Sequence, residues 1–207
     1  MQERNWPNFD SNLINKVSKI LNSGKINYTN GSYGKKFEKK FSQFVGNKYS
    51  IALCNGTAAL EVAIKSLKLP KKSEIIVSAR SFFASASCIV NTGHIPIFVD
   101  VDVLTQNISL NGIRKNITNK TRAIICVHLG GIPCDMYGIK NIAKINNIKI
   151  IEDCSQAHGA SINNKQVGSF GDISTWSFCN DKIISTLGEG GMISTNNKSL
   201  FEFCKRY

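Results

Sequence analysis

A chain of 207 residues, 42% of them hydrophobic, is long enough to bury the core of one globular domain. Its net charge of +12 does not indicate nucleic-acid binding, because the lysines are scattered and form no basic block with interleaved aromatic residues; it would suit an anionic substrate. No window approaches the roughly 18 apolar residues of a membrane span, and the opening residues lack the apolar run of a signal peptide. We therefore expect a cytoplasmic protein without a membrane segment.

The cysteines and histidines do not suggest a metal site or a disulfide framework. The cysteines are odd in number, dispersed, and without Cys-x-x-Cys spacing, and the histidines show no His-x-x-x-His pattern. We expect reduced core thiols and no bound metal. The cysteines are Cys54, Cys88, Cys126, Cys134, Cys154, Cys179 and Cys204.

The first 33 residues are predicted to form a helix and a loop. Residues 11–22 carry apolar side chains at helical spacing after a candidate cap at Ser11, and Gly24 ends the run. Residues 23–34 are rich in turn formers and are either a connector or a loop that contacts substrate. A second helix then presents Phe37, Phe41, Phe44 and Val45 on one face.

From residue 49 onward, short runs rich in Ile and Val alternate with helical segments. The predicted strands cover 49–53, 74–78, 95–99, 123–128 and 149–152, with helices starting near 57, 84, 110 and 137. Strands without a polar face are typical of a parallel sheet that is buried on both sides. We predict an α/β fold with three α/β/α layers and a mostly parallel sheet.

Polar groups stand where several predicted strands end. These are Gly56-Thr57, Asp153 and Ser177, together with the aromatic Phe82, and ligands of such sheets bind at the carboxyl ends of the strands. Gly56-Thr57 at a helix start can cradle an anion, although Thr57 could simply cap the helix. Asp153 could likewise be a cap.

Lys182 follows Ser177 by five residues and supplies an amine. A phosphorylated pyridine aldehyde needs an amine to condense with, a counter-charge for its ring nitrogen and donors for its phosphate. Lys182, Asp153 and Ser177 offer these three groups, so pyridoxal phosphate is the leading candidate cofactor.

With these motifs in this order, the chain resembles the DegT/DnrJ/EryC1/StrS family of nucleotide-sugar aminotransferases, which are fold-type I, aspartate-aminotransferase-like enzymes dependent on pyridoxal phosphate. The resemblance covers essentially the whole chain. The matching stretches are SGKIN at 23–27, NGTAAL at 55–60, PIFVDVD at 96–102, VHLGG at 127–131, IEDCSQAHGA at 151–160, GSFGD at 168–172, Ser177-Phe178 with Lys182, and GEGG at 188–191.

The resemblance implies a role for each matching residue. Lys182 would form the Schiff base and carry protons, and Asp153 would pair with the pyridine nitrogen; these are the expected catalytic residues. The other expected cofactor-binding residues are Gly56, Thr57, Ala58 and Ser177 around the phosphate, Gln156 at the ring hydroxyl and Phe82 stacked on the ring. Alternatives remain: Phe82 as a core residue, Gln156 as a surface amide and His158 as a structural histidine.

The implied reaction transfers an amino group, from an amino-acid donor that is usually glutamate, to a nucleotide-linked keto-deoxysugar. Some relatives carry histidine in place of the lysine and are dehydratases, a branch that Lys182 argues against. The resemblance also implies a homodimer for the full-length protein and a setting in polysaccharide precursor synthesis.

Family members are nearly twice this length. We expect residues 1–33 to form the N-terminal helix and substrate-side loop, and residues 34–207 the cofactor-binding large domain, incomplete at its end and without the C-terminal small domain. The chain would then be a fragment or one half of a split aminotransferase. The alternative is a truncated, non-catalytic remnant or cofactor-binding module.

Overall fold

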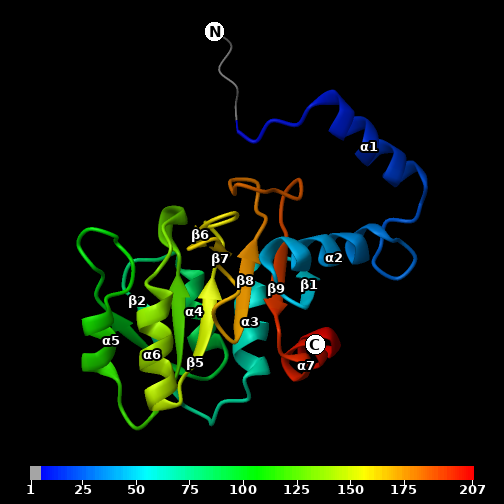
Figure 1. Cartoon of the computed structure of the whole chain (residues 1–207). Helices are drawn as coiled ribbons and strands as arrows, with labels where there is room; N and C mark the ends of the chain where they lie inside the picture. Colours follow the sequence, from blue (N-terminus) through cyan, green and yellow to red (C-terminus); the bar gives the residue numbers. More distant parts are fainter. Residues whose placement is uncertain (1–5) are drawn as a thin grey trace.

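Seven strands form one sheet in the order β1–β9–β8–β5–β4–β2–β3 in the computed structural model, which describes residues 6–207 (Figure 1). The sheet strands are β1 (Tyr49–Leu53), β2 (Glu74–Ser78), β3 (Ile95–Val99), β4 (Thr121–Val127), β5 (Lys149–Asp153), β8 (Ile173–Ser177) and β9 (Gly191–Thr195). A small hairpin joins β6 (Ser161–Ile162) and β7 (Lys165–Gln166). The helices are α1 (Ser11–Asn22), α2 (Tyr33–Val45), α3 (Gly56–Ser66), α4 (Ala84–Asn91), α5 (Leu110–Asn116), the short 3₁₀ helix η1 (Leu129–Gly131), α6 (Met136–Asn146) and α7 (Lys198–Arg206).

The sheet is mostly parallel, as the sequence predicts. The pairs β2/β3, β2/β4, β4/β5 and β5/β8 are parallel, whereas β9 runs antiparallel to both of its neighbours, β1 and β8. Consequently β5 and β8 bring their carboxyl ends, Asp153 and Ser177, to the same edge of the sheet.

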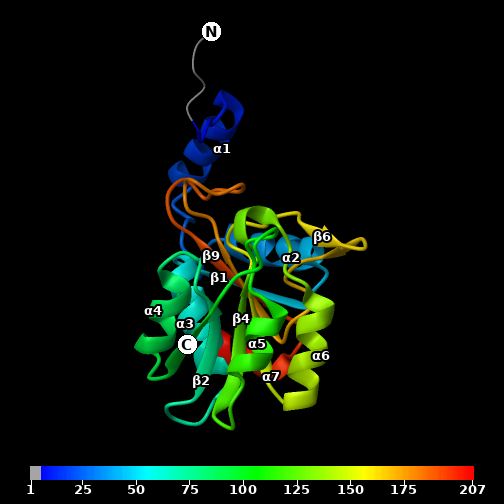
Figure 2. The same cartoon turned by 90° about the vertical axis from the view of Figure 1, so that its left-hand side faces the viewer.

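Helices cover both faces of the sheet and complete the three predicted layers. A hydrophobic core lies on each face, and successive residues of β2 contribute to them in turn. Ile75 and Val77 pack with α3 and α4, while Ile76 packs with α5 and α6. Figure 2 shows α3 and α4 on one side of the sheet and α5 and α6 on the other. Burial on both faces explains why the strands carry Ile and Val without a polar alternation.

A third core cluster joins α2 to the sheet beside β8. Phe41 of α2 packs against Trp176 and Phe178, with ring centroids 5.1 and 5.3 Å away. These aromatic contacts hold the segment that leaves β8. The predicted face of α2 is thus confirmed for Phe37, Phe41 and Val45, which belong to this cluster, whereas Phe44 is 42% exposed and lies outside it.

The first helix has the predicted bounds but a different cap. Oδ1 of Asp10 accepts the backbone N–H of Leu13 at 2.7 Å, so Asp10 caps α1 and Ser11, the expected cap, is the first helical residue. Both views show α1 beyond the body of the sheet and helices (Figures 1 and 2), and none of its residues is buried. Within residues 6–207, none of the helices combines the length and the apolar composition needed to cross a membrane.

Candidate active site

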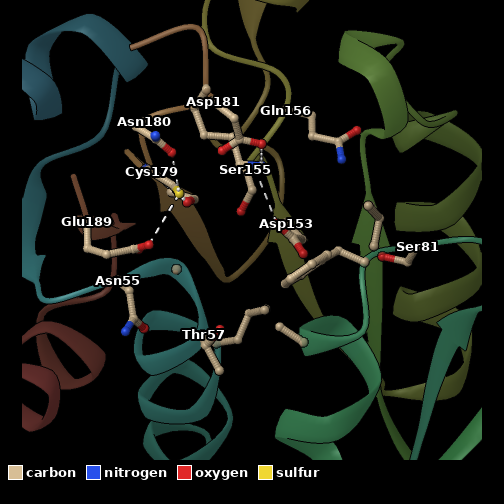
Figure 3. Close-up of a pocket in the computed structure, with 17 residues that line it drawn as sticks. Asn55, Thr57, Ser81, Asp153, Ser155, Gln156, Cys179, Asn180, Asp181 and Glu189 are labelled. Carbon is tan, nitrogen blue, oxygen red and sulfur yellow. Dashed lines mark hydrogen bonds and ion pairs between the residues drawn. The ribbon is translucent and has the colours of Figure 1, made fainter. Parts of the chain in front are cut away.

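A cavity of about 420 Å³ lies at the carboxyl ends of β5 and β8, opposite the start of α3 (Figure 3). The structure brings almost all of the predicted site residues to this cavity. Its lining includes Gly56, Thr57, Phe82, Asp153, Gln156, Ser177 and Lys182. Ala58 is not in the lining, although it follows Thr57 in the first turn of α3.

The start of α3 forms one wall. Asn55 caps this helix, since its Oδ1 accepts the backbone N–H of Ala58 at 2.8 Å. The alternative reading, in which Thr57 caps the helix, is therefore wrong, and the Ala58 N–H is already used. Because the first N–H groups of a helix have no acceptor within it, Gly56 and Thr57 remain as donors toward an anion, helped by the helix dipole.

Asp153, the last residue of β5, forms the opposite wall. Its side chain is buried, with 4% of the residue exposed. Oδ2 accepts the hydroxyl of Ser85 at 2.9 Å, and Oδ1 accepts the backbone N–H of Ser155 at 3.2 Å. Its own backbone carbonyl accepts the N–H of His128 at 3.1 Å. Two hydrogen bonds thus hold the carboxylate at the edge of the cavity, and the backbone contact with His128 fixes the residue that carries it.

Lys182 lies in the segment that connects β8 to β9. Its Nζ is 2.9 Å from Oδ2 of Asp181, and its side chain is 20% exposed. The hydrogen bond from Lys182 lowers the pKa of the Asp181 carboxyl. The segment is tied at its base, where Phe178 N–H donates to the carbonyl of Gly190 at 2.8 Å. An amine that is partly shielded from water therefore lies on the same cavity as Asp153.

Gln156 and Phe82 complete the expected set. Oε1 of Gln156 accepts the N–H of Gly130 at 2.7 Å, which leaves the amide NH₂ of the side chain to donate. Phe82 is 69% exposed and is not a core residue. Its ring offers a free apolar face beside the cavity.

His158 does not line the cavity. It is buried between Trp176 and Phe178, at ring-centroid distances of 5.4 and 5.5 Å, and neither ring nitrogen has a hydrogen-bond partner in the described part of the chain. Burial, opposed by a contact with the Ser177 backbone, lowers its pKa to about 4. The imidazole is therefore neutral at ordinary pH, in keeping with a structural residue.

Sequence reasoning missed several residues of the site. Asn55 has a signal that could have identified it, because an Asn directly before a helix is a typical cap. Ser85 has no comparable signal, since its partner Asp153 is distant in sequence. The lining residues not predicted are Asn55, Leu60, Ser81, Ala84, Val127, Ser155, Cys179, Asn180, Asp181 and Glu189.

A buried group next to Asp153 resembles a metal site in composition. His128, Glu152 and Cys154 each place a possible ligand atom within 4.8 Å of the others. However, Nδ1 of His128 accepts the N–H of Cys134 at 3.0 Å, and its Nε2 is 3.2 Å from Glu152. Glu152 also accepts three backbone N–H groups, from Gly168, Phe170 and Gly171. The imidazole of His128 and the carboxylate of Glu152 already form hydrogen bonds with each other and with backbone N–H groups. We therefore assign this cluster a role in the stability of the fold.

Comparison with known proteins gives this arrangement a context. A model of the DegT/DnrJ/EryC1/StrS aminotransferase family matches residues 7–207. GDP-perosamine synthase of Escherichia coli O157:H7 is 45% identical over 191 residues, which make up 92% of this chain and 52% of that protein. The chain thus spans about half the length of this curated relative.

Solved structures support the fold as well. The aminotransferase from Psychrobacter cryohalolentis superposes with a TM-score of 0.97 at 46% identity, covering 98% of this chain and 51% of that one. NtdA from Bacillus subtilis, solved with bound cofactor PMP, gives a TM-score of 0.86 at 34% identity, covering 92% of this chain and 42% of that one. The predicted fold class is confirmed, and the cofactor class predicted from the sequence is confirmed for this group of proteins. Since the family model matches nearly the whole chain, the chain belongs to the DegT/DnrJ/EryC1/StrS aminotransferase family.

Proposed function

We propose that this chain provides the cofactor-binding part of a pyridoxal-phosphate-dependent aminotransferase that acts on a nucleotide-linked keto sugar. The observation that carries the proposal is the placement of Lys182, Asp153 and the start of α3 around one cavity. An amine, a buried carboxylate and a helix N-terminus are the partners that an aldehyde, a ring nitrogen and a phosphate require.

The shape of the cavity is compatible with the cofactor. The wall at α3 is closely packed, because a Cβ at Gly56 would lie 2.9 Å from Cβ of Ser177. An anion could therefore approach the backbone of Gly56 and the hydroxyl of Ser177 together. The exposed face of Phe82 would cover one side of a flat ring, and the NH₂ of Gln156 could donate to a ring oxygen.

The bound cofactor would supply an electron sink for the carbon that loses its proton. Asp153 would hold the proton on the ring nitrogen, since a buried carboxylate stabilises a neighbouring positive charge. Nζ of Lys182 would hold the cofactor through its aldehyde carbon, whose oxygen leaves as water, and as a free amine it would hold and return the substrate proton. Oδ2 of Asp181 lies 2.9 Å from Nζ of Lys182 and would orient the amine for both roles.

The substrates follow from the relatives. GDP-perosamine synthase is named for a nucleotide-linked amino sugar. We propose a nucleotide-linked keto sugar as amino acceptor and an amino acid, in this family usually glutamate, as donor. We further propose a cytoplasmic homodimer, with residues 1–33 on the substrate side and residues 34–207 as the cofactor domain. Because the chain spans about half of its relatives, complete transfer is proposed for a protein or complex that also contains their other half.

A cofactor titration tests the proposal. The purified chain is titrated with pyridoxal phosphate and followed by its visible absorbance, then reduced with borohydride and mapped by mass spectrometry. We expect a saturable band and a reduced adduct on Lys182, both lost in Lys182→Ala and retained in Lys144→Ala, which changes an exposed lysine of α6. Labelling spread over many lysines would contradict the proposal. A band and adduct without any amino transfer, even when the other half of a relative is supplied, would favour the second candidate, a cofactor-binding module without transaminase activity.

A further inference from the structure

Two hydroxyl groups connect the wall of the cavity to Asp153. Oγ of Ser81 lies 2.7 Å from Oγ of Ser85, and the Ser85 hydroxyl donates to Oδ2 of Asp153 at 2.9 Å. Ser85 is 1% exposed and belongs to α4, whereas Ser81 precedes that helix and lines the cavity. The contacts therefore form a continuous chain from Ser81 through the buried Ser85 to Asp153, so two residues of the cavity wall are joined by one that lies behind it.

The direction of these hydrogen bonds follows from the number of protons. A serine hydroxyl has one proton, and an ionised carboxylate can only accept. Since the Ser85 proton is used on Asp153, the proton between the two serines comes from Ser81. Both hydroxyl dipoles then point toward the carboxylate, and each bond strengthens the other in a buried setting.

We propose that Ser81 and Ser85 are positioning residues that hold the Asp153 carboxylate toward the ring nitrogen of the cofactor; this inference rests on the proposed function. Oδ2 of Asp153 accepts the Ser85 hydroxyl, and Oδ1 accepts the backbone N–H of Ser155. Donors to an ionised carboxylate stabilise its charged form. Without the Ser85 hydroxyl, the carboxylate would compete more strongly for the proton of the ring nitrogen, and the ring would lose positive charge.

The charge on the ring has a measurable consequence. A protonated ring nitrogen withdraws electrons, which lowers the pH at which the nitrogen linking the cofactor to Lys182 loses its proton. This pH is read from the visible absorbance during a titration and needs no turnover. A loss of ring charge should therefore raise the spectral midpoint and weaken the binding of the cofactor.

The test uses serine-to-alanine variants of the whole chain. We expect Ser85→Ala to raise the dissociation constant of pyridoxal phosphate about tenfold, the size expected for a hydrogen bond to a charged group, and to shift the spectral midpoint upward. Ser81→Ala should move both quantities in the same direction by less, since it acts through Ser85. Ser85→Thr keeps a hydroxyl and should restore the midpoint toward that of the unsubstituted chain.

Ser87→Ala is the matched control, because Ser87 lies on the same helix and is only partly buried. It should bind the cofactor and titrate like the unsubstituted chain. If Ser85→Ala loses thermal stability without a change of the spectral midpoint, the inference is overturned, and the role of Ser85 is limited to the packing of α4 against the sheet. If the unsubstituted chain binds the cofactor on Lys182 and all serine variants titrate alike, the inference fails while the proposed function stands. If the unsubstituted chain forms no adduct on Lys182, both fail.

Discussion

Gly56, the first residue of α3, and Ser177, the last residue of β8, touch so closely that a Cβ on Gly56 would lie 2.9 Å from Cβ of Ser177. Atoms of this kind do not approach to such a distance, so a side chain at position 56 must displace the end of β8 or the start of α3. The contact joins the two elements that are expected to hold the cofactor phosphate.

Gly56→Ala should therefore weaken cofactor binding more than it weakens the fold. The added methyl group moves the Ser177 hydroxyl and the free N–H groups of α3 apart, which should raise the dissociation constant for pyridoxal phosphate by about tenfold or more, as expected for the loss of a hydrogen bond to a charged phosphate. Absorbance titration measures the effect. Gly188→Ala is the control, because a Cβ at Gly188 would meet nothing within 4 Å. Equal affinities for the two variants would contradict the assignment of this contact to the phosphate site.

Two neighbouring phenylalanines allow a matched test of ring stacking. Phe82 and Phe83 are 69% and 77% exposed, but only Phe82 lines the cavity. We expect Phe82→Ala to weaken pyridoxal phosphate binding by about 1 kcal/mol, the scale of one aromatic contact, with little change in thermal stability. Phe83→Ala should leave the affinity unchanged. An equal loss in both variants would place the effect in the local backbone rather than in stacking.

Local signals were sufficient to predict most of the fold. The strands at 49–53, 74–78 and 95–99 have the predicted bounds, because short, mainly apolar runs between turn-forming or polar residues are typical of buried strands. Caps were less predictable. Asp10 and Asn55, rather than Ser11 and Thr57, cap α1 and α3, since adjacent residues of similar capping ability differ only in backbone geometry.

The sequence did not predict the short hairpin or the contact between Ser85 and Asp153. The hairpin of β6 and β7 turns at Asn163 and Asn164, both with positive φ, and its strands of two residues are too short to give a pattern. The parallel order of the sheet brought Asp153, Ser177 and Lys182 together as expected. Ser85 was not foreseen, because its bond to Asp153 depends on how α4 packs beside β5.

Glu152 is a buried carboxylate that joins β5 to the segment after β7. Oε1 accepts the N–H groups of Phe170 and Gly171 at 2.8 and 2.6 Å, and Oε2 accepts the N–H of Gly168 at 2.7 Å and lies 3.2 Å from Nε2 of His128. Glu152 is 0% exposed. Both of its carboxylate oxygens are therefore used on backbone N–H groups and on His128, and water does not reach the Glu152 side chain to replace a lost partner.

Glu152→Gln should lower the free energy of unfolding by about 3 kcal/mol, because the new NH₂ group faces donors and leaves a backbone N–H unpaired. Urea denaturation measures this loss. Asp172→Asn is the control: its Oδ2 accepts the N–H of Ile150 at 2.9 Å, but its side chain is 29% exposed, so water can compensate and we expect about 1 kcal/mol. Equal losses would show that burial does not decide the cost.

His158 should make the fold sensitive to acid. Its pKa is lowered to about 4, chiefly by burial, whereas the unfolded chain has the ordinary value of 6.5. Above pH 6.5 the His158 imidazole is neutral in both the folded and the unfolded chain, so it does not change the free energy of unfolding. As pH falls from 6.5 toward 4, His158 binds a proton in the unfolded chain but stays neutral in the folded chain. The free energy of unfolding therefore falls by an amount on the order of 3 kcal/mol. Urea denaturation at a series of pH values measures this slope.

His158→Gln removes the titrating group and should flatten the decline between pH 6.5 and 4 while costing some stability at pH 7.5, where the aromatic packing is disturbed. His94→Gln is the comparison, since His94 is less buried and burial lowers its pKa as well; it should flatten the slope less. The readout is the slope of unfolding free energy against pH, so a loss of stability that is uniform across pH does not mimic it. If His158→Gln keeps the full acid slope, folding does not lower the pKa of His158, and a polar partner rather than an apolar aromatic pocket must surround the imidazole.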